Sequence, residues 1–401
     1  MAEEVRGGTV CASGPAAPEP DTPRLRALLP PLRPPADRRR WIAVAVVLLL
    51  LVVVAVSCVD AGGDGGRPSS AAWQTPAGPD RPTLRRAAPP NVRIGTAVDS
   101  RLLDTDPRYR STLAADFNAV TPEYVMKWAA LERAPDRYDW EPPDRLVAFA
   151  EANGQAVYGH ALVWHSSVPA WVSESWSPAQ LRELLRKHIT TVVSRYRGKV
   201  WAWDVVNEAL AENGTLRQSI WLRKLGPGYL ADAFRWAHEA DPDARLFIND
   251  YGTEGRTKKA DALWRLVRQL RSQGVPVQGV GFQSHLRADQ DPTDIAGNLR
   301  RFAALGVAVA VTELDVRLQL PATPEKLVGQ ALLYQHVLEA CLAVPTCESF
   351  TLWGFTDASS WITYHYPGYG AACVFDGELK PKPAHASLIA ELREPRSAPP
   401  G

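Results

Sequence analysis

Two glutamates follow apolar runs, in short motifs whose residue types suit acid–base chemistry. Glu208 lies in Trp203-Asp-Val-Val-Asn-Glu-Ala209, and Glu313 lies in Val311-Thr-Glu-Leu-Asp315. A carboxylate at the end of a buried strand is costly unless it is paired or hydrogen-bonded, so a salt-bridged acid explains either motif taken alone. Two such carboxyls facing one cleft instead suit the cleavage of a glycosidic bond. One protonates the leaving oxygen, and the other attacks the sugar or stabilises its developing positive charge.

The elements that must position these glutamates are visible as apolar, β-branched runs that alternate with amphipathic stretches from residue 91 onward. The expected strands are 92–98, 119–121, 156–160, 200–206, 245–249, 277–283, 307–312 and 349–353, and the expected helices include 177–196, 229–240, 257–273, 292–304 and 324–343. Ser177 and Thr323 are the predicted caps of two helices, because each precedes a proline at the first helical position. Eight strand–helix alternations over about 300 residues favour an α/β fold of the (β/α)8 TIM-barrel type over a doubly wound sheet.

A barrel places its active site at the carboxyl ends of several strands. Polar and aromatic side chains gather at those ends in this chain: Glu123, Lys127, His160, Trp164, Asn207, Glu208, Asp250, Tyr251, Gln283, His285, Glu313, Asp315 and Trp353. The chain also has 14 Trp, of which all but Trp41 and Trp73 follow residue 90. Because the face of an indole ring stacks on the apolar face of a sugar, this enrichment favours a glycan cleft.

Seven stretches of the chain resemble motifs of the endo-β-1,4-xylanases of glycoside hydrolase family 10. They are Phe117–Trp128 (FNAVTPEYVMKW), Gly159–His165 (GHALVWH), Trp203–Ala209, Asn249–Tyr251, Gly279–His285, Val311–Asp315 and Leu352–Gly354. They occur in the family's order from about residue 91 to 393. The resemblance implies a (β/α)8 barrel, cleavage of xylan or xylo-oligosaccharides with retention of anomeric configuration, and no cofactor.

The resemblance also implies roles for individual residues. Glu208 is the implied acid/base, Glu313 the implied nucleophile, and Asn207 the implied ligand of a sugar 2-hydroxyl. His285 is implied to hydrogen-bond Glu313 and to contact Asp315, which keeps the nucleophile ionised and oriented. The implied substrate-binding residues are Glu123, Lys127, His160, Trp164, Tyr251, Gln283, Trp353 and Trp361.

Three positions depart from the family pattern. Tyr124 stands where the family usually has Asn, Gly252 where Asn is usual, and Ile362 where Arg commonly follows the tryptophan. The tyrosine-rich segment 361–373 is a candidate source of replacement stacking. We expect these departures to change the preference for particular sugars and to leave the reaction type unaltered.

Other kinds of site are less well supported by the sequence. His160 and His165 flank a tryptophan, but there is no HExxH or CxxC pattern, so we expect no catalytic metal. Ser166 and Ser167 lie outside any G-x-S-x-G elbow, which argues against a serine hydrolase. The alternatives are a glycan-binding or sensing protein built on an inactive barrel, and a retaining glycosidase that prefers another β-glucan. The intact pair Glu208 and Glu313 favours an enzyme over a binding protein.

The cysteines carry a prediction about covalent structure. Cys341 and Cys347 lie six residues apart after an expected helix, and in an oxidising compartment we expect them to form a disulfide. The alternative is a pair of buried thiols. Cys373 is expected to be a buried free thiol.

The first 90 residues differ in composition from the rest. Residues 41–59 carry no charge and are long enough to span the hydrocarbon core of a bilayer as a helix. Three arginines precede this segment and two aspartates follow it closely, so the positive-inside rule places residues 1–40 in the cytoplasm and the barrel outside. Residues 60–90 hold 5 Gly and 6 Pro and are expected to be a linker, followed by the barrel at 91–393 and a tail at 394–401.

Two alternatives to a retained membrane anchor remain open. The stretch Ala55-Val56-Ser57-Cys58 resembles a lipoprotein box with Cys58 as the lipidated residue, and it also holds a small-x-small pattern typical of a signal cleavage site. We favour a single-pass protein of the cell membrane with an extracellular catalytic domain. A lipid-anchored form is the second choice and a secreted form the third.

The overall charge indicates which kinds of partner the chain can bind. The chain has 45 Lys+Arg against 44 Asp+Glu, a formal net charge of +1. A nucleic-acid-binding protein would need a basic face, so we expect no nucleic-acid partner. The expected partners are the polysaccharide and, through residues 41–59, the membrane, and the barrel is expected to be a monomer.

Overall fold

The computed structural model describes residues 81–290 and 294–395. Eight parallel strands form a closed ring in the order β1 (Arg93–Val98), β2 (Ala119–Pro122), β5 (Ala156–Gly159), β7 (Val200–Asn207), β8 (Arg245–Asp250), β9 (Gly279–Phe282), β11 (Ala308–Gln319) and β12 (Cys347–Leu352). The pairing of β12 with β1 and of β9 with β11 closes the ring. The predicted (β/α)8 barrel and all eight predicted strands are therefore confirmed.

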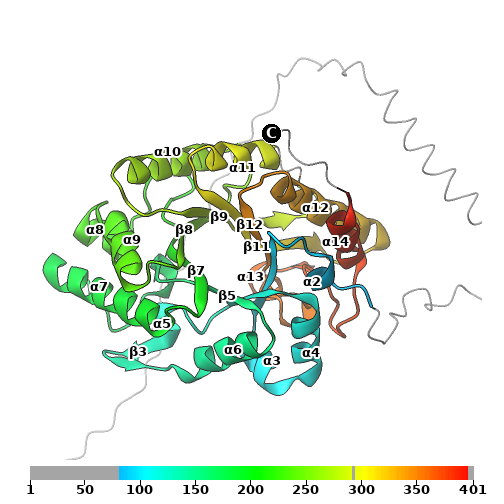
Figure 1. Ribbon diagram of the computed structural model, residues 1–401, viewed down its shortest axis with the longest axis horizontal. Helices are drawn as coiled ribbons and strands as arrows, with labels where there is room; N and C mark the ends of the chain where they lie inside the picture. Colours follow the sequence, from blue (N-terminus) through cyan, green and yellow to red (C-terminus); the bar gives the residue numbers. More distant parts are fainter. Residues whose placement is uncertain (1–80, 291–293, 396–401) are drawn as a thin grey trace, which may run out of the picture. The chain divides into compact units, whose positions relative to one another are not determined.

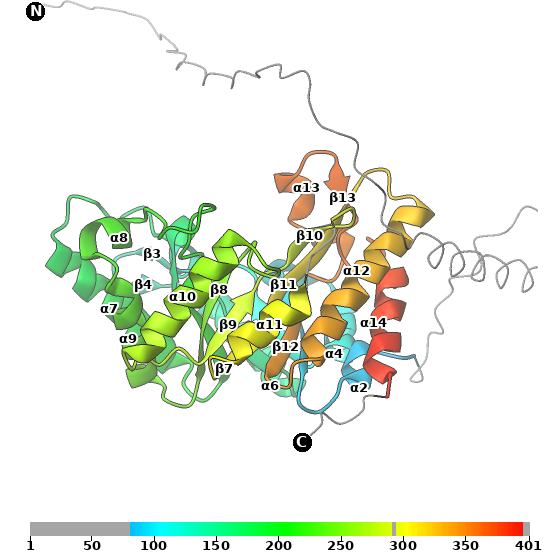
Figure 2. The ribbon, with the colours of Figure 1, turned by 90° about the horizontal axis from the view of Figure 1, so that it is seen from above.

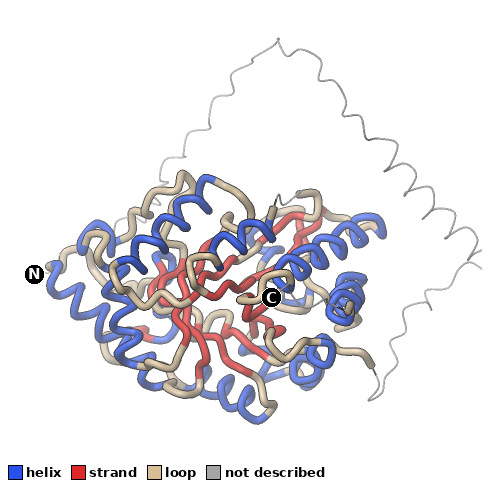
Figure 3. The backbone as a smooth tube through the Cα atoms, turned by 45° about the horizontal axis from the view of Figure 1, so that its top comes forward, coloured by secondary structure: helices blue, strands red, loops and turns tan. Residues whose placement is uncertain are grey.

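Helices surround the ring of strands on its outside (Figures 1 and 3). They are α2 (Leu84–Ala87), α3 (Ser100–Thr105), α4 (Pro107–Asp116), α5 (Trp128–Leu131), α6 (Glu141–Ala152), α7 (Pro178–Arg195), α8 (Ile220–Leu225), α9 (Tyr229–Ala240), α10 (Lys258–Ser272), α11 (Ile295–Ala303), α12 (Pro324–Leu342), α13 (Ile362–His365) and α14 (Pro383–Arg393). The predicted caps are confirmed, since the hydroxyl of Ser177 accepts from the Gln180 N–H and that of Thr323 from the Lys326 N–H.

Large aromatic side chains pack on both faces of the barrel strands, with Phe247 inside the ring and Trp203 outside it against Tyr196 at the end of α7, and glycines on neighbouring strands make room for them. A Cβ atom at Gly159 would lie 2.1 Å from the ring of Trp203, and one at Gly279 would lie 2.3 Å from the ring of Phe247. Both rings are fully buried. Such close packing leaves the strands little freedom to shift, so the carboxyl ends of β5, β7, β8 and β9 are held in fixed positions.

Strand β11 is longer than the sequence predicts. The apolar run suggested 307–312, whereas the strand continues to Gln319. Its second half pairs with the short strands β10 (His285–Arg287) and β13 (Tyr369–Gly370), which satisfy its backbone groups beyond the ring. Together with α13 these strands project past the carboxyl ends of the other barrel strands (Figure 2). We call β10, α13, β13 and the second half of β11 the upper wall. Three further short strands are β3 (Glu132–Ala134), β4 (Arg137–Tyr138) and β6 (Val163–Trp164).

The folded domain begins before Asn91, so the predicted linker at 60–90 is wrong at its carboxyl end. Leu84 of α2 is fully buried and α2 contacts both α4 and α14. Arg81 pairs with the buried carboxylate of Asp116. One apolar side chain and one ion pair thus dock a stretch whose composition alone is typical of a linker.

The remaining predictions for the leader concern residues outside the described part of the chain. The cytoplasmic segment 1–40, the membrane segment 41–59 and the linker up to residue 80 belong to this group, as does the tail after residue 395. Within residues 81–290 and 294–395, no helix has both the length and the apolar composition of a membrane span.

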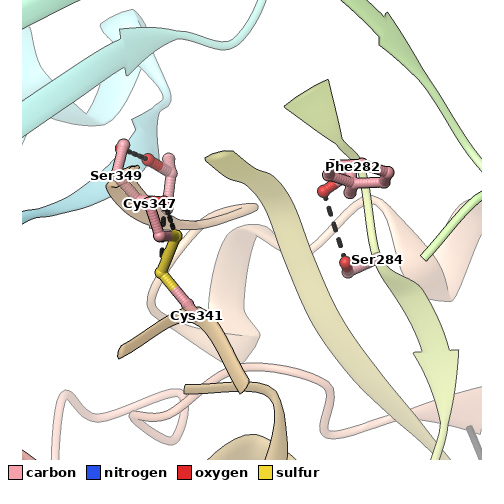
Figure 4. Close-up of a disulfide and its surroundings, with 6 residues drawn as sticks. Phe282, Ser284, Cys341, Cys347 and Ser349 are labelled. Carbon is pink, nitrogen blue, oxygen red and sulfur yellow. Dashed lines mark hydrogen bonds between the residues drawn. A yellow bond between two sulfur atoms is a disulfide. The ribbon is translucent and has the colours of Figure 1, made fainter. Parts of the chain in front are cut away.

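The predicted disulfide joins the end of α12 to the start of β12 (Figure 4). Cys341 and Cys347 are bonded, with their Cα atoms 5.5 Å apart. Cys373 is a free, buried cysteine, as expected, and burial raises the pKa of its thiol. Both cysteine predictions are confirmed.

Candidate active site

One cavity of about 660 Å³ opens at the carboxyl ends of the barrel strands. Twelve of the thirteen residues expected in the site line it: Glu123, Lys127, His160, Trp164, Asn207, Glu208, Tyr251, Gln283, His285, Glu313, Trp353 and Trp361. The thirteenth, Asp315, is 1% exposed and hydrogen-bonds two of the lining side chains from behind. The structure therefore brings these residues together at one rim of the barrel.

Glu313 is a buried carboxylate that is held ionised. It lies on β11 with 4% of its surface exposed. Asn249 donates from Nδ2 to its Oε1 at 2.6 Å, and His285 donates from Nε2 to its Oε2 at 3.3 Å. Burial raises the pKa of Glu313, but the nearby charges of His160, His285 and Lys127 outweigh burial, and its pKa is lowered. The site therefore presents an anionic oxygen to whatever occupies the cavity.

His285 connects this carboxylate to a second one. Its Nδ1 donates to Asp315 Oδ2 at 2.9 Å, and Trp361 Nε1 donates to the same oxygen at 2.6 Å. Burial lowers the pKa of His285, but Asp315 and Glu313 raise it to about 10. The imidazolium thus shares its positive charge between two carboxylates, and Asp315 fixes the orientation of both aromatic rings.

Glu208 has a different environment. Its backbone has a φ of 55°, in the left-handed region, and its N–H donates to the Asn249 carbonyl at 2.8 Å. Its carboxyl receives one long hydrogen bond, from Gln283 Nε2 at 3.4 Å, and lies 3.8 Å from His165 Nδ1. Burial lowers the pKa of His165. Among the described residues, the Glu208 carboxyl therefore accepts no hydrogen bond from a cationic side chain, whereas Glu313 accepts one from His285.

Asn207 is oriented by its neighbours. Its Oδ1 accepts from Asn249 Nδ2 at 3.0 Å and from Gln283 Nε2 at 3.2 Å. Because these contacts use the amide oxygen, the amide nitrogen is directed to donate to a ligand in the cavity. This matches the hydroxyl-binding role that the sequence resemblance implies.

Lys127 and Glu123 lie at one end of the cavity among tryptophans. The Lys127 ammonium lies 4.7 Å from the centre of the Trp164 ring and 5.7 Å from that of Trp353. Burial lowers the pKa of Lys127, and burial raises the pKa of Glu123 to about 7. Aromatic faces beside a charged donor and a carboxyl acceptor suit a sugar ring, which needs stacking and hydrogen bonds at once.

Asp204 is a site residue that sequence analysis missed. Its Oδ2 is hydrogen-bonded to His160 Nδ1 at 2.8 Å, and its Oδ1 accepts from Tyr158 Oη at 2.7 Å. A charged residue inside the apolar run 200–206 was the available signal. His160, Asp204 and Glu313 are also close enough to suggest a metal site. The direct His160–Asp204 hydrogen bond occupies the nitrogen and the oxygen that a cation would need, which disfavours that interpretation.

Arg217 is a second missed residue, and no local pattern pointed to it. It comes from the loop after β7 and donates to the Glu208 carbonyl at 3.0 Å, the Leu210 carbonyl at 2.8 Å and the Tyr251 hydroxyl at 3.1 Å. Asp250 Oδ2 accepts from the Leu210 N–H at 3.1 Å. These contacts hold the backbone from Glu208 to Leu210 and tie it to an aromatic residue of the cavity wall.

The three departures from the family pattern lie in different surroundings. Tyr124 is 62% exposed and does not line the cavity, whereas Gly252 lines it. Ile362 is fully buried in α13. In the tyrosine-rich segment, Tyr366 lines the cavity and Tyr364 is 84% exposed. One of the tyrosines is thus placed to stack on a ligand.

Comparison with known proteins supplies independent evidence. The model of the family described as glycosyl hydrolase family 10 matches residues 83–391. An endo-1,4-beta-xylanase from Agaricus bisporus is 42% identical over 299 residues, which cover 74% of this chain and 90% of that protein. Endo-1,4-beta-xylanase B from Thermotoga neapolitana is 40% identical over 309 residues, which cover 76% of this chain and 89% of that protein.

Solved structures agree with the sequence matches. The crystal structure of xylanase 10B from Thermotoga petrophila in complex with xylobiose is similar with a TM-score of 0.76 and 38% identity. The match covers 78% of this chain and 97% of that chain. The similarity therefore extends over the part of the chain that forms the barrel and its cavity.

The charge on His285 predicts a pH dependence of stability. Its pKa is about 10 in the folded protein, against an ordinary value of 6.5, so the folded state binds this proton more tightly. The stabilising contribution is complete below pH 6.5 and is lost as the pH rises toward 10. We expect the stability difference between wild type and His285→Gln, measured by urea unfolding, to shrink by roughly 2–4 kcal/mol over that range.

Replacement of an exposed histidine on α12, His336→Gln, is the matched control and is expected to give a difference that does not change with pH. A constant difference for His285→Gln as well would contradict the charged state assigned to the ring.

Proposed function

The chain belongs to glycosyl hydrolase family 10 and is a glycoside hydrolase, and from that premise we propose that it hydrolyses internal β-1,4-xylosidic bonds of xylan. The observation that carries the proposal is the pairing of Glu208 and Glu313 in one tryptophan-lined cavity, with only Glu313 held by cations. The relatives named above as endo-1,4-beta-xylanases, and the neighbour that binds xylobiose, support xylan as the substrate.

In the first step of the proposed mechanism, Glu313 is the nucleophile. Its ionised oxygen attacks the anomeric carbon, and the bond from that carbon to the leaving oxygen breaks. Glu208 gives its proton to the leaving oxygen, so the product departs as a neutral alcohol. The donors on Glu313, from Asn249 and His285, orient the attacking carboxylate and help keep it ionised until the bond forms.

In the second step Glu208 acts as the base. It takes a proton from water, the water oxygen attacks the anomeric carbon, and the bond to Glu313 breaks. Two inversions at one carbon return the original configuration, which defines a retaining enzyme. Glu208 has already given its proton to the leaving group, and because the charge on Glu313 is absent in the intermediate, no neighbouring negative charge disfavours the ionised form that accepts the proton from water.

The direct test is to incubate residues 81–401 with soluble xylan and, separately, with carboxymethylated cellulose, and to identify the products. Short xylo-oligosaccharides released from the xylan interior are the expected result. Cleavage of cellulose in preference to xylan would favour a different β-glucan as substrate. Binding of xylan without any release of reducing ends would favour the glycan-binding alternative.

Replacement of Glu313 by Gln is predicted to abolish the reaction and to leave the fold intact. The amide keeps an oxygen that accepts from Asn249 but cannot attack the sugar. We expect xylan hydrolysis to fall to background, with an unfolding midpoint close to that of wild type. Glu183→Gln, an exposed change on α7, is the control and should match wild type in both measurements. Normal cleavage by Glu313→Gln would refute the nucleophile assignment.

Replacement of Glu208 by Ala is predicted to depend on the leaving group. A general acid typically contributes about 10²–10⁴ in rate, or roughly 3–5 kcal/mol of the barrier. We expect kcat/KM on xylan to fall by that factor and to fall far less on an aryl xylobioside whose phenolate leaves without protonation. Losses of equal size on both substrates would assign Glu208 a role other than proton donation.

We also propose that residues 41–59 anchor the enzyme in the membrane with the barrel outside the cell. The uncharged segment between arginines and aspartates supports this topology. The full chain is expected in the membrane fraction after carbonate extraction, with its barrel accessible to protease added to intact cells. Cys58→Ala is expected to leave this distribution unchanged. Release by that variant would instead indicate a lipid anchor, and recovery in the medium would indicate cleavage.

A further inference from the structure

The upper wall of the cavity carries an arginine to which the proposed reaction assigns no role. Arg317 lies on β11 four residues beyond Glu313 and lines the same cavity. Alternate residues of a strand face the same side, and each residue advances the chain by about 3.3 Å. The Cα atom of Arg317 therefore lies about 13 Å along the strand from that of Glu313. We call the part of the cavity that holds Glu208 and Glu313 the floor, and Arg317 lies above it.

The guanidinium of Arg317 is oriented but has no anionic partner. It lies 4.2 Å from the centre of the Tyr366 ring, and one of its nitrogens donates to the His285 carbonyl at 3.4 Å. Within the described residues, no carboxylate is at ion-pair distance from it. A nearby acid, Asp289, accepts from Nε of Arg287 at 2.9 Å and from Nη2 of the same residue at 2.6 Å. Most of the five donors of Arg317 thus remain available.

Two other arginines of the barrel are used differently. Arg301 pairs with Asp261 on the outer helices, and Arg245 pairs with Glu348. Arg317 instead lies over the rings of Tyr366 and Tyr369 and lines the cavity.

We propose that Arg317 binds the carboxylate of a uronic acid branch on the xylan backbone. This inference rests on the proposed function and adds a class of substituent to it. The planar guanidinium matches a carboxylate with two parallel hydrogen bonds, and the ring of Tyr366 offers a face for the branching sugar. The carboxylate of a branching sugar lies one ring away from the xylan backbone. A guanidinium above the floor of the cavity is therefore better placed to bind it than one on the floor.

The charges of the floor support the same conclusion. Glu208, Glu313 and Glu123 line the lower cavity, so an anionic group there would meet negative charge. Arg317 lies in the upper wall, four residues along β11 from Glu313, and is therefore separated from these carboxyl groups. An acidic branch is therefore accommodated where the cavity wall is cationic and excluded where it is acidic.

The test compares two substrates that differ only in charge. One is a xylo-oligosaccharide with a single glucuronosyl branch, and the other is the same compound with its carboxyl group reduced to an alcohol. We expect Arg317→Gln to lower kcat/KM about tenfold on the charged compound, the low end for a hydrogen bond to a charged group, and to leave the reduced compound unaffected. Arg317→Lys is expected to retain part of the preference, because it keeps the charge without the planar fork.

Arg287→Gln is the matched control, because Arg287 lies opposite Arg317 in the strand register but outside the cavity lining. It should not alter the ratio of the two rates, and added salt should reduce that ratio in wild type and in Arg287→Gln but not in Arg317→Gln. Equal losses of Arg317→Gln on both compounds, or no loss on either, would overturn the proposal. Failure of the wild type to cleave an unbranched xylo-oligosaccharide would count against the proposed function instead.

Discussion

The rest of the active site depends on the burial of one negative charge. An ionised carboxylate that is 4% exposed is unstable unless donors and cations compensate for the water it has lost. Glu313 obtains that compensation from Asn249 on β8 and from His285 after β9. Its partners come from different strands, so the charge can be stabilised only when the ring of strands is closed. Ionisation of the nucleophile therefore requires a closed barrel.

The same requirement explains why the supporting residues are themselves bound. His285 must keep its proton, and Asp315 provides for this by accepting from its Nδ1. Asp204 orients His160 in a parallel manner on the other side of the carboxylate. Glu208 has no such support and is positioned through its backbone instead, by the Asn249 carbonyl and by Arg217. The structure thus stabilises the charge of Glu313 and fixes the orientation of Glu208.

Sequence reasoning predicted those parts of the molecule that depend on local patterns. Apolar runs located all eight strands, and prolines after Ser177 and Thr323 located two helix starts. The rim residues followed, because carboxyl ends of parallel strands meet at one face. The docking of α2 and the extension of β11 were not predictable, since both depend on partners more than 20 residues away. Arg217 was missed for a different reason, because the carbonyls that it binds are only nine and seven residues away but are brought to it by a loop that no local pattern predicts.

The upper wall separates recognition from catalysis. The floor is crowded with groups whose protonation states are coupled, so a substitution there alters the reaction itself. The second half of β11, with β10 and β13, lies beyond the closed ring and is paired through its own short strands. A side chain in that region, such as Arg317, can contact a branch of the substrate without entering the network around Glu313. The extension of β11 past its neighbours thus provides a surface that can determine which substrates are preferred. Residues on this surface can change while the buried charge of Glu313 stays compensated.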